Sequence, residues 1–474
     1  MQLRSMHFKA GAARALANKT LQSNLRKFGA AGLALLRARA VEEYGVEAFE
    51  TLRTAGAEIR DRALAMLDAY LERFEREATQ RGATVLFAES GVEACDLVLE
   101  ICRRHGIKKA IKSKSMLSEE ASVNEALIAN AVQPIETDLG EYIIQLAEEP
   151  PSHIIAPAVH KSKNEVADLF QRSHRKPRKT DISQMTREAR EALRPHFLSA
   201  DLGISGGNFL IAETGSGVIV TNEGNGRMVT TLPRVHVCIT GIEKVIPTLD
   251  DFATLNRLLS RSATGQSVEN YISVFTGPRR AGDADGPEHL YFILVDGGRT
   301  RLIGTDMEDM LRCIRCGACM NHCPVYKTVG GHAYGWVYPG PMGAVLTPSY
   351  VGLENALDLP QAATLCNQCG VVCPVRIPLP ELLRKLREKQ VERGLRPKSE
   401  MRGLRVWSWV AQRPRLYALA ARWGARCLWL LGGTARRIRR LPFGKSWTLA
   451  RDFPAPQGAT FRDLYRKRLR DAPK

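Results

Sequence analysis

Cys-Ile-Arg-Cys-Gly-Ala-Cys-Met-Asn-His-Cys-Pro occupies residues 313–324. The first three cysteines recur at every third residue, and the fourth, Cys323, stands directly before Pro324. A cubic 4Fe-4S cluster needs soft thiolate ligands that converge from several directions, and this spacing is typical of it. In such runs the first three thiolates bind one cluster, whereas the cysteine before proline binds a second one. The run therefore predicts an electron carrier with another cysteine set elsewhere in the chain.

A second set follows at residues 366–374, which read Cys-Asn-Gln-Cys-Gly-Val-Val-Cys-Pro. Aligned from its Cys-Pro end, this set supplies three cysteines and has Ala363 where a fourth is expected. Crossover of ligands between the sets then predicts one 4Fe-4S cluster with four cysteine ligands and a second cluster with only three. The predicted ligands are Cys313, Cys316, Cys319 and Cys373 for the first cluster, and Cys323, Cys366 and Cys369 for the second.

The missing ligand of the second cluster has three explanations. The cluster is of the 3Fe-4S type, or a group other than cysteine binds there, such as the adjacent His322 or water, or a partner chain supplies a cysteine. Zinc is the alternative for all seven cysteines, because Cys-x2-Cys pairs also bind zinc. Zinc sites do not need a third cysteine and a Cys-x3-Cys-Pro ending in duplicate, so the spacing favours iron-sulfur clusters.

The remaining cysteines lie in apolar surroundings without metal-ligand spacing, and we predict that they are small buried residues. They are Cys95, Cys102, Cys238 and Cys427. Eleven cysteines among 474 residues are too few for a disulfide scaffold. Exposed clusters need reducing surroundings, so the cytoplasm is the predicted compartment.

One apolar run, at residues 28–36, imitates a secretory signal. Arg37 and Arg39 stand where the cleavage region should be neutral, so we predict a helix there. Nowhere does an apolar run approach the roughly 20 residues that a membrane-spanning helix requires.

The positive charge of the chain is concentrated near its C-terminus. Residues 375–474 hold 26 Lys and Arg against 7 Asp and Glu, a net charge of +19, whereas the whole chain carries +18. Five of the six tryptophans also lie there, interleaved with arginines such as those at 436–440. Aromatic and cationic side chains together suit peripheral contact with an anionic membrane face, or docking of an acidic partner. The alternative is a tail that packs its tryptophans on its own protein; nucleic acid is not expected, because no binding motif accompanies the charge.

Local patterns predict four parts. Residues 1–80 are rich in alanine, leucine and charged residues at helical spacing, and should form a helical arm or cap. Short apolar runs then alternate with amphipathic segments, the pattern of an α/β domain, at residues 81–303. A ferredoxin-like, helical iron-sulfur domain is expected at 304–395 and a basic helical region at 396–474.

Within the α/β part, apolar runs bounded by turn residues predict the individual strands. The expected strands are at residues 84–88, 109–112, 153–157, 208–212, 217–221, 235–240 and 289–295. Helices are expected at residues 91–105, 124–131 and 185–193, a basic loop at 172–180 and a polar turn at 277–286.

Four polar clusters stand at predicted strand ends, where α/β sheets bind ligands. They contain Lys112, Lys114, Glu136, Asp138, Gly206, Asn208 and residues 222–225. None is a nucleotide signature, since neither Gly-x-Gly-x-x-Gly nor Gly-x4-Gly-Lys-Ser/Thr occurs. The charged residues fit a capping or surface role as well as a ligand role. For Asn222-Glu-Gly-Asn225 a hairpin turn is the simpler interpretation, because Asn and Gly tolerate positive φ.

Several of these stretches resemble a known family. They are Glu136-Thr-Asp-Leu-Gly-Glu141, Pro151-Ser-His-Ile-Ile-Ala-Pro157, Asn222-Glu-Gly-Asn225, Gly241-Ile-Glu-Lys244, both cysteine sets and Gly340-Pro-Met-Gly343 between the sets. Together they are similar to the iron-sulfur subunit family called lactate utilisation protein B, over residues 10–380. The resemblance implies a central LUD domain with a fold like that of sugar-phosphate isomerases and CoA-transferases. It also implies a second cysteine set with three cysteines, which makes Ala363 a family feature.

The resemblance implies oxidation of L-lactate to pyruvate by a three-protein system, with electrons passing through this subunit to an acceptor that the motif does not identify. Since no flavin or nicotinamide signature is present, the chain is expected to be a non-catalytic component that works with other subunits. One alternative is an electron adaptor for a different dehydrogenase or a heterodisulfide-type reductase. Another is a CoA-transferase-like catalyst in which Glu223 forms a covalent intermediate.

Overall fold

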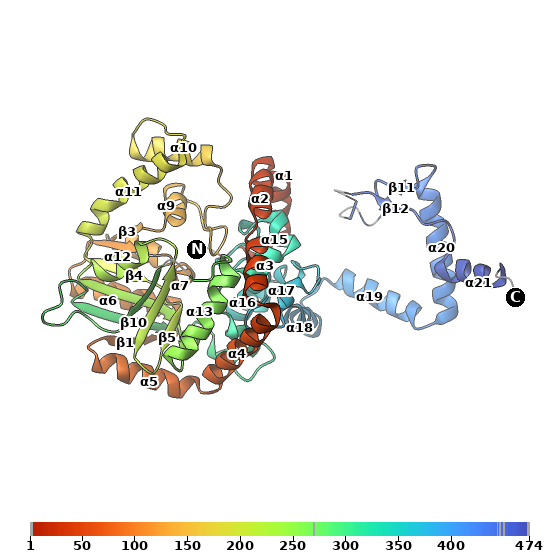
Figure 1. Cartoon of the computed structure of the whole chain (residues 1–474). Coiled ribbons are helices and arrows are strands. Elements are labelled where there is room, and N and C mark those ends of the chain that lie inside the picture. The colour runs from red at the N-terminus through yellow and green to blue at the C-terminus, as the bar shows by residue number, and fades with distance from the viewer. Residues whose placement is uncertain (1–2, 269–270, 443, 445–446, 449–450, 472–474) are drawn as a thin grey trace. The chain divides into compact units, whose positions relative to one another are not determined.

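The computed structural model describes residues 3–268, 271–442, 444, 447–448 and 451–471 (Figure 1). Residues Met1–Arg393 form one compact unit and residues Gly394–Lys474 a second. The boundaries predicted inside the first unit, after residues 80 and 303, stay a prediction.

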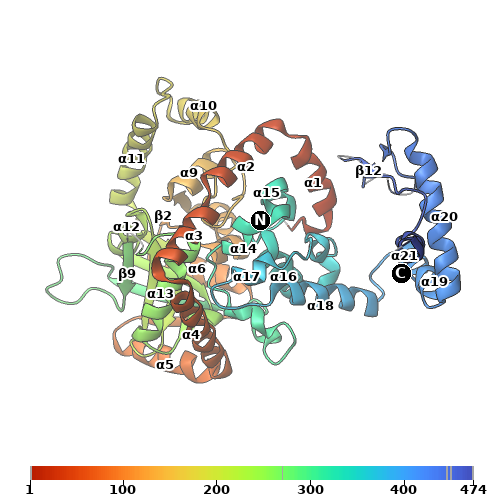
Figure 2. The same cartoon turned by 45° about the vertical axis from the view of Figure 1, so that its right-hand side comes forward.

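Helices occupy the N-terminal part, as predicted. They are η1 (Ser5–His7), α1 (Phe8–Ala17), α2 (Lys19–Ala31), α3 (Leu33–Tyr44), α4 (Val46–Ala65) and α5 (Leu67–Gln80). The helix expected over residues 28–36 is interrupted at Gly32, whose φ of +58° ends α2 before α3 begins. Helices α1 and α2 lie against α15 (Pro324–Val329), and α3 against α14 (Ala318–His322), so these helices cover the iron-sulfur segment (Figure 2).

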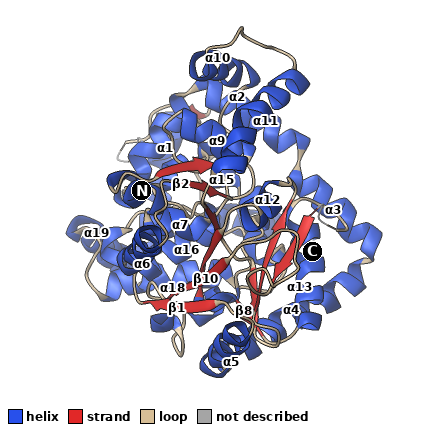
Figure 3. Ribbon diagram, turned by 90° about the vertical axis from the view of Figure 1, so that its left-hand side faces the viewer, coloured by secondary structure: helices blue, strands red, loops and turns tan. Residues whose placement is uncertain are grey.

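The centre of the first unit is a six-stranded sheet in which every neighbouring pair is parallel. Its strand order is β1 (Thr84–Ala88), β10 (His289–Val295), β7 (Val235–Gly241), β4 (Leu202–Ser205), β2 (Lys109–Lys112) and β3 (Gln133–Glu136). Because all six strands run the same way, their carboxyl ends meet at one edge. Figure 3 shows these strands surrounded by helices.

Helices follow most of these strands and bury the sheet on both faces, as a parallel sheet requires. They are α6 (Gly91–Arg104), α7 (Met116–Ala121), α8 (Val123–Ala129), α9 (Leu139–Leu146), α10 (Lys163–His174), α11 (Ile182–Ser199), α12 (Asn225–Thr231) and α13 (Leu249–Ala263). One apolar core joins α6 to β7 and β10 through fully buried side chains such as Val98, Val237 and Ile293. A second joins α5 to the other face through Phe74 and Phe292, whose rings pack edge to face.

A smaller mixed sheet lies beside the first. Its order is β8 (Val245–Ile246), β5 (Phe209–Ile211), β6 (Ser216–Thr221) and β9 (Tyr271–Phe275), with β5 and β8 parallel and the other pairs antiparallel. The short 3-10 helix η2 (Ile242–Lys244) connects β7 to β8. Residues at the end of β7 therefore sit where the two sheets join.

The iron-sulfur segment is built from short helices and turns. They are η3 (Thr300–Leu302), η4 (Glu308–Arg312), α14, α15, η5 (His332–Tyr334), α16 (Gly340–Val351), η6 (Leu353–Asn355), η7 (Leu359–Gln361), α17 (Gln368–Val371) and α18 (Leu379–Glu392). Helix α16 is buried over nearly its whole length, which explains its apolar sequence on every face.

The C-terminal unit contains α19 (Lys398–Ala411), α20 (Pro414–Gly432), β11 (Arg437–Ile438), β12 (Phe453–Pro454) and α21 (Phe461–Asp471). The prediction that Cys427 is buried is wrong, since it is exposed on α20. The reason is that α20 has little core to pack on: only Gly432 of this helix is buried. Among the helices that the structure describes, none is long and apolar enough to cross a membrane.

Six of the seven predicted strands are confirmed within one residue at either end, whereas the strand predicted at 153–157 is wrong. The His153 Nδ1 atom accepts hydrogen bonds from the backbone N–H groups of Ile155 (3.0 Å) and Ala156 (3.1 Å). The N–H of Ser152 donates to the carbonyl of Pro157 at 3.0 Å. These bonds close the segment into a loop, and the pairing that a strand needs is lost.

The hairpin turn predicted at residues 222–225 is also wrong. This segment joins β6 to α12, and Gly224 has a φ of −72°. Asn225 begins the helix and is buried, and its side-chain amide donates to Thr137 Oγ1 at 3.3 Å. Its role is to tie α12 to the loop after β3. The basic loop expected from residue 172 begins only at Arg175, because α10 continues to His174.

We predict that His153 makes the stability of the first unit depend on pH. Burial lowers the pKa of His153 from 6.5 to about 4. Its Nε2–H donates to Asn321 Oδ1 at 2.9 Å, so the ring is neutral in the folded state. Below pH 6.5 His153 is protonated in the unfolded chain but stays neutral in the folded chain. The free energy of unfolding is therefore highest above pH 6.5 and falls progressively towards pH 4, by up to about 3 kcal/mol.

The measurement is anaerobic urea unfolding at several pH values. His153→Gln should lower the free energy of unfolding at pH 7 by about 1–3 kcal/mol and make its pH slope shallower by about one proton. His7→Gln, at an exposed position, serves as the control and should keep the slope of the unaltered protein. Equal slopes in His153→Gln and the unaltered protein would contradict the prediction.

Candidate iron-sulfur centre and the adjoining pocket

The fold brings four cysteines from both sets around one cavity. Cys313 follows η4, Cys316 precedes α14, Cys319 lies in the first turn of α14, and Cys373 follows α17. Apart from Arg315, the other side chains that line the cavity are apolar, with Met310, Met342 and Ile377 among them. These four cysteines are the set that the crossover pattern predicts for the first cluster.

The backbone of residues 313–319 is a tight turn. Arg315 has a φ of +59° and Gly317 a φ of +75°, both in the left-handed region. A Cβ atom at Gly317 would lie 3.0 Å from the side chain of Ile155, so glycine lets the loop after His153 pack on the turn. Burial and then the neighbouring Cys373 raise the pKa of Cys316 to about 12. A protonated thiol is a poor nucleophile, and a bound metal would displace the proton of Cys316.

The other three cysteines form a second group. Burial and then Cys323 raise the pKa of Cys369 to about 12, and Cys366 raises it further. Cys323 is buried, Cys369 is half-buried and Cys366 is exposed. The second group therefore reaches the surface of the first unit, whereas Cys316 and Cys373 of the first group are buried.

The hydroxyl of Tyr334 bears on whether the residues around the cysteines fit iron-sulfur clusters. Tyr334 is fully buried, and its hydroxyl has no hydrogen-bond partner among the described residues. Burial raises the pKa of Tyr334, and Cys323, Cys319 and Cys369 raise it further. A buried hydroxyl without a partner is costly, and it lies within the electrostatic reach of both cysteine groups. Cluster sulfur would supply the missing acceptor, so the residues present fit the group.

His322 is the non-cysteine side chain that the sequence analysis considered as a ligand. His322 is half-buried and its Nδ1 atom lies 2.8 Å from the carbonyl of Ala318 in its own helix. Donation from Nδ1 leaves the lone pair on Nε2, which is the form that binds metal. Within the described ranges, no three His, Cys, Asp or Glu side chains are grouped closely enough to hold one metal ion.

Arginines from the N-terminal helices brace the first cysteine group. Arg53 of α4 is buried and donates through Nε (2.9 Å) and Nη2 (2.7 Å) to the carbonyl of Cys373. Arg37 of α3 donates to the neighbouring carbonyl of Val372 at 3.0 Å. The sequence analysis missed both residues, because their partners lie more than 300 residues further along the chain.

A pocket lies at the carboxyl edge of the six-stranded sheet. It encloses about 280 Å³ and is lined by residues that follow β2, β3, β4, β6 and β7. The iron-sulfur segment supplies a further wall, through Ile314, Arg315 and Tyr338, and Ile154 and the helix α13 also line the pocket. The pocket and the first cysteine cavity thus share Ile314 and Arg315.

Glu243, in η2, anchors this shared wall. It accepts hydrogen bonds from Arg299 Nε at 2.7 Å and from Arg315 Nη2 at 3.5 Å. Burial alone would raise the pKa of Glu243. The neighbouring cations, of which Arg299 has the largest effect and Lys244 the next, lower this pKa to about 2. Arg299 also forms a two-point ion pair with Glu120, at 3.1 and 3.0 Å.

The charged residues noted in the strand-end clusters separate into two roles. Lys112 is buried and pairs with Glu136 at 2.7 Å and Glu119 at 3.3 Å, which is a structural role. Asp138 caps α9 by accepting from the N–H groups of Gly140 and Glu141. Lys114 lines the pocket and has no ion pair within 4 Å among the described residues.

Glu223 also lines the pocket, and its Oε2 accepts from the N–H of Leu139 at 3.2 Å. Burial and then Asp138 raise the pKa of Glu223. Its contact at the start of α9 is that of a carboxylate that caps a helix.

Comparison with known proteins identifies the parts of the chain. Residues 71–295 match the LUD domain, residues 309–377 the 4Fe-4S dicluster domain, and residues 383–470 the family described as lactate utilisation protein B, C-terminal. Lactate utilization protein B of Bacillus licheniformis is 42% identical over 92% of each chain. The chain belongs to the lactate utilization protein B family.

Two further relatives and one solved structure also match this chain. Lactate utilization protein B of Bacillus subtilis and an E. coli relative, named "Uncharacterized electron transport protein YkgF", are each 42% identical and match 91% of this chain and 90% of their own. A solved DUF162 family protein from Deinococcus radiodurans covers 48% of this chain and 98% of its own, with 12% identity and a TM-score of 0.28. The family match includes the 4Fe-4S dicluster domain, which supports iron-sulfur clusters at the cysteine sets.

We predict that Arg53 stabilises the first cysteine group. Arg53→Met keeps the length of the side chain but removes both hydrogen bonds to the Cys373 carbonyl. The free energy of unfolding should therefore fall by about 2 kcal/mol. Iron bound at this group should be lost faster to a chelator under anaerobic conditions. Thermal unfolding and the rate of iron release measure the two effects. Arg39→Met, on an exposed position of α3, is the matched control; identical behaviour of the two variants would refute the prediction.

Proposed function

We propose that this chain is an iron-sulfur electron-transfer subunit in the oxidation of L-lactate to pyruvate. The observation that carries the proposal is the gathering of all seven motif cysteines into two adjoining groups. Curated relatives named for lactate utilization, and one named for electron transport, support the substrate and the role. Under this proposal the chain relays electrons and does not itself catalyse the oxidation.

The proposed ligands are Cys313, Cys316, Cys319 and Cys373 for a 4Fe-4S cluster, with Cys323, Cys366 and Cys369 for a second cluster that has three cysteine ligands. When bound, such clusters accept and pass on single electrons. The chain's own residues supply the surroundings that set cluster potentials: Tyr334 offers a buried hydroxyl near both groups, and Arg37 and Arg53 place positive charge beside Cys373.

Burial suggests a direction for the relay. Cys316 and Cys373 of the first group are buried, and the cavity of this group shares a wall with the pocket, whereas Cys366 of the second group is exposed. Electrons would therefore enter near the first group and leave through the second, where an acceptor can approach. Cys369 and Cys319 raise the pKa of Tyr334 together, which supports close spacing of the two groups.

Partner subunits follow from the chemistry of the reaction. Oxidation of a hydroxyl to a carbonyl removes two electrons, and the sequence has no flavin or nicotinamide signature. Other subunits of a lactate-oxidising complex would take part, in keeping with the three-protein system that the resemblance implies. The parallel sheet with its pocket at the carboxyl edge supports the CoA-transferase and sugar-phosphate isomerase likeness proposed for the LUD domain.

The C-terminal unit supports peripheral contact with the inner, anionic face of the membrane by an otherwise cytoplasmic protein. Trp407 and Trp423 are 64% and 60% exposed, and Leu430 is 68% exposed. Arg413 lies 4.2 Å from the ring centroid of Trp409, on the same stretch of chain. Exposed aromatic and arginine side chains suit the headgroup region of anionic lipids.

We predict that L-lactate reduces the clusters of this chain in a complex reconstituted with its partner subunits without air. Electron paramagnetic resonance with iron and sulfide analysis measures the clusters and counts them. Cys373→Ala should remove the first cluster and Cys369→Ala the second, each leaving the other. Cys427→Ala, on an exposed cysteine outside both groups, is the control and should match the unaltered protein. Bound zinc as the only metal, or clusters that lactate leaves oxidised, would overturn the proposal.

We predict that the C-terminal unit binds anionic vesicles. The full chain should sediment with vesicles that contain phosphatidylserine and remain free with phosphatidylcholine alone. Trp407→Ala with Trp423→Ala should weaken binding by at least about fivefold, and deletion after Arg396 should abolish it. Leu198→Ala, at a position 68% exposed in the first unit, serves as the control. Equal sedimentation of the truncated and full chains would refute the membrane role.

A further inference from the structure

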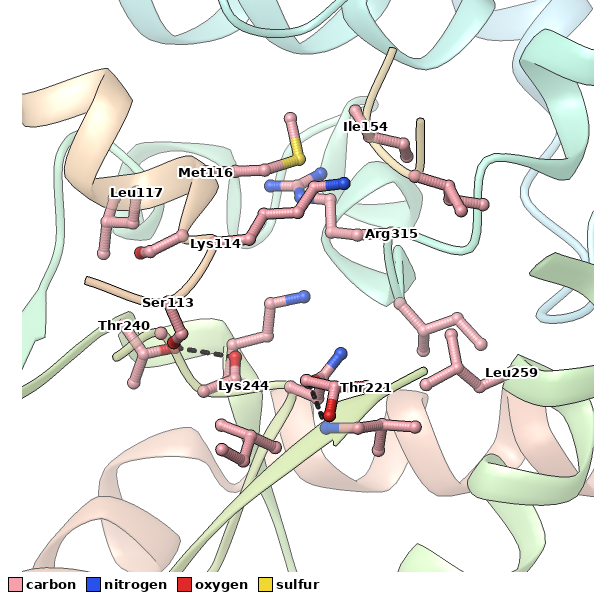
Figure 4. Close-up of a pocket in the computed structure, with 18 of the residues that line it drawn as sticks. Ser113, Lys114, Met116, Leu117, Ile154, Thr221, Thr240, Lys244, Leu259 and Arg315 are labelled. Carbon is pink, nitrogen blue, oxygen red and sulfur yellow. Dashed lines mark hydrogen bonds between the residues drawn. The ribbon is translucent and has the colours of Figure 1, made fainter. Parts of the chain in front are cut away.

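The pocket at the carboxyl edge of the sheet collects cationic side chains from three separate elements. Lys114 follows β2, Lys244 ends η2, and Arg315 belongs to the turn between the first two motif cysteines. Figure 4 shows the three side chains extending into the same hollow. At about 280 Å³ the pocket is at the small end of ligand pockets, which run from roughly 300 to 1,000 Å³, so it suits a small molecule.

Lys114 and Lys244 feel carboxylates only at longer range, Lys114 chiefly that of Asp138 and Lys244 that of Glu243. Among the residues that the structure describes, neither Lys114 nor Lys244 has an ion pair within 4 Å, whereas the nearby Lys112 and Arg299 are fully paired. Lys244 is only 8% exposed, and its ammonium has one hydrogen bond, to the carbonyl of Cys313 at 3.3 Å. A buried ammonium needs compensating acceptors. The pocket therefore offers positive charge that the protein leaves partly unsatisfied.

The carboxylates on the wall are already engaged. Asp138 accepts two backbone N–H groups of α9, Glu223 accepts one, and Glu243 is held by Arg299 and Arg315. Hydroxyl and amide groups also line the pocket, with Ser113, Thr240 and Asn208 among them, and apolar side chains such as Ile154 and Leu259 form much of the rest. Positive charge beside neutral polar groups suits an anion that also carries a hydroxyl or carbonyl oxygen.

We infer that this pocket binds a small organic-acid anion, with its carboxylate between Lys114 and Lys244 and with Arg315 beside it. The choice of a 2-hydroxy or 2-oxo acid rests on the proposed function; the anion site itself rests on the cavity and its cations. Because Lys244 contacts the Cys313 carbonyl and Arg315 follows Cys313 by two residues, a bound acid would lie next to the first cysteine group.

The geometry of the pocket also favours a carboxylate over a phosphate as its ligand. Phosphate sites in α/β folds combine a glycine-rich loop with the first turn of a long helix. Here the helix after β2, α7, has six residues, and no glycine-rich nucleotide signature precedes it. A carboxylate has fewer oxygens and one negative charge, which two lysines satisfy.

The test is anaerobic equilibrium binding of L-lactate, pyruvate and inorganic phosphate to the full, cluster-loaded protein. Saturable binding of an acid is expected, and Lys114→Met should weaken it at least about tenfold, as loss of a charged contact does. Lys114→Arg keeps the charge and should stay within about threefold. Lys108→Met, on an exposed residue outside the pocket, should bind as the unaltered protein does.

Lys244→Met should weaken binding to a similar extent, with iron content measured alongside because Lys244 contacts Cys313. Lys114 makes no such contact, so its variants test the site even where Lys244→Met alters the cluster. No saturable binding of either acid, equal affinity in Lys114→Met, or tighter binding of phosphate would overturn the inference.

Cluster reduction, measured on the same samples, distinguishes this failure from that of the proposed function. If lactate reduces the clusters in the complex but no acid binds to this chain, the anion site is refuted and the electron relay is kept. If an acid binds to this chain but lactate never reduces its clusters, the anion site is kept and the electron relay is refuted.

Discussion

The first unit depends on a buried carboxylate, Glu243, where three separate parts of the chain meet. Arg299 and Arg315 donate to its side chain, and Arg60 of α4 donates to its backbone carbonyl. Only glycine fits at position 241, where a Cβ atom would lie 2.0 Å from the Glu243 carboxylate. Breaking a buried charge pair costs about 3–5 kcal/mol, because the remaining charge is left without compensation. This junction therefore holds the sheet, the N-terminal helices and the cysteine turn in one arrangement.

The same junction explains why the pocket and the cysteine cavity adjoin. Glu243 and Lys244 follow β7 at the carboxyl edge of the sheet, and they contact Arg315 and Cys313 in the next segment. Arg315 also lies over the ring of Tyr338, 4.8 Å from its centroid, which closes the wall between the two spaces. A LUD domain and a dicluster domain that looked separable along the sequence are thus combined through shared residues. Electron entry near the pocket and exit near exposed Cys366 is the arrangement this packing supports.

Local patterns predicted much of the fold. The strands at residues 109–112, 235–240 and 289–295 are confirmed because their apolar runs are bounded by turns and buried in a parallel sheet. The wrong predictions at residues 153–157 and 222–225 have causes in local hydrogen bonding and backbone geometry. At 153–157 the His153 ring replaces strand pairing with its own backbone hydrogen bonds, and at 222–225 the chain enters a helix instead of a hairpin. Strands β3, β4 and β9 were not predicted, because short strands with proline, glycine or polar residues carry a weak pattern.

The sequence by itself determined the ligand chemistry and the grouping of the cysteines, since spacing within a short turn dictates which thiolates can reach one cluster. It also determined the concentration of charge and tryptophan in the C-terminal unit. Only the tertiary structure decided that Arg37, Arg53 and Arg60 brace the cysteine segment and that Lys114, Lys244 and Arg315 face one pocket. The reason is physical: a cysteine motif acts over a few residues, whereas the arginines and Lys244 find their partners across some 70 to 335 residues of intervening chain.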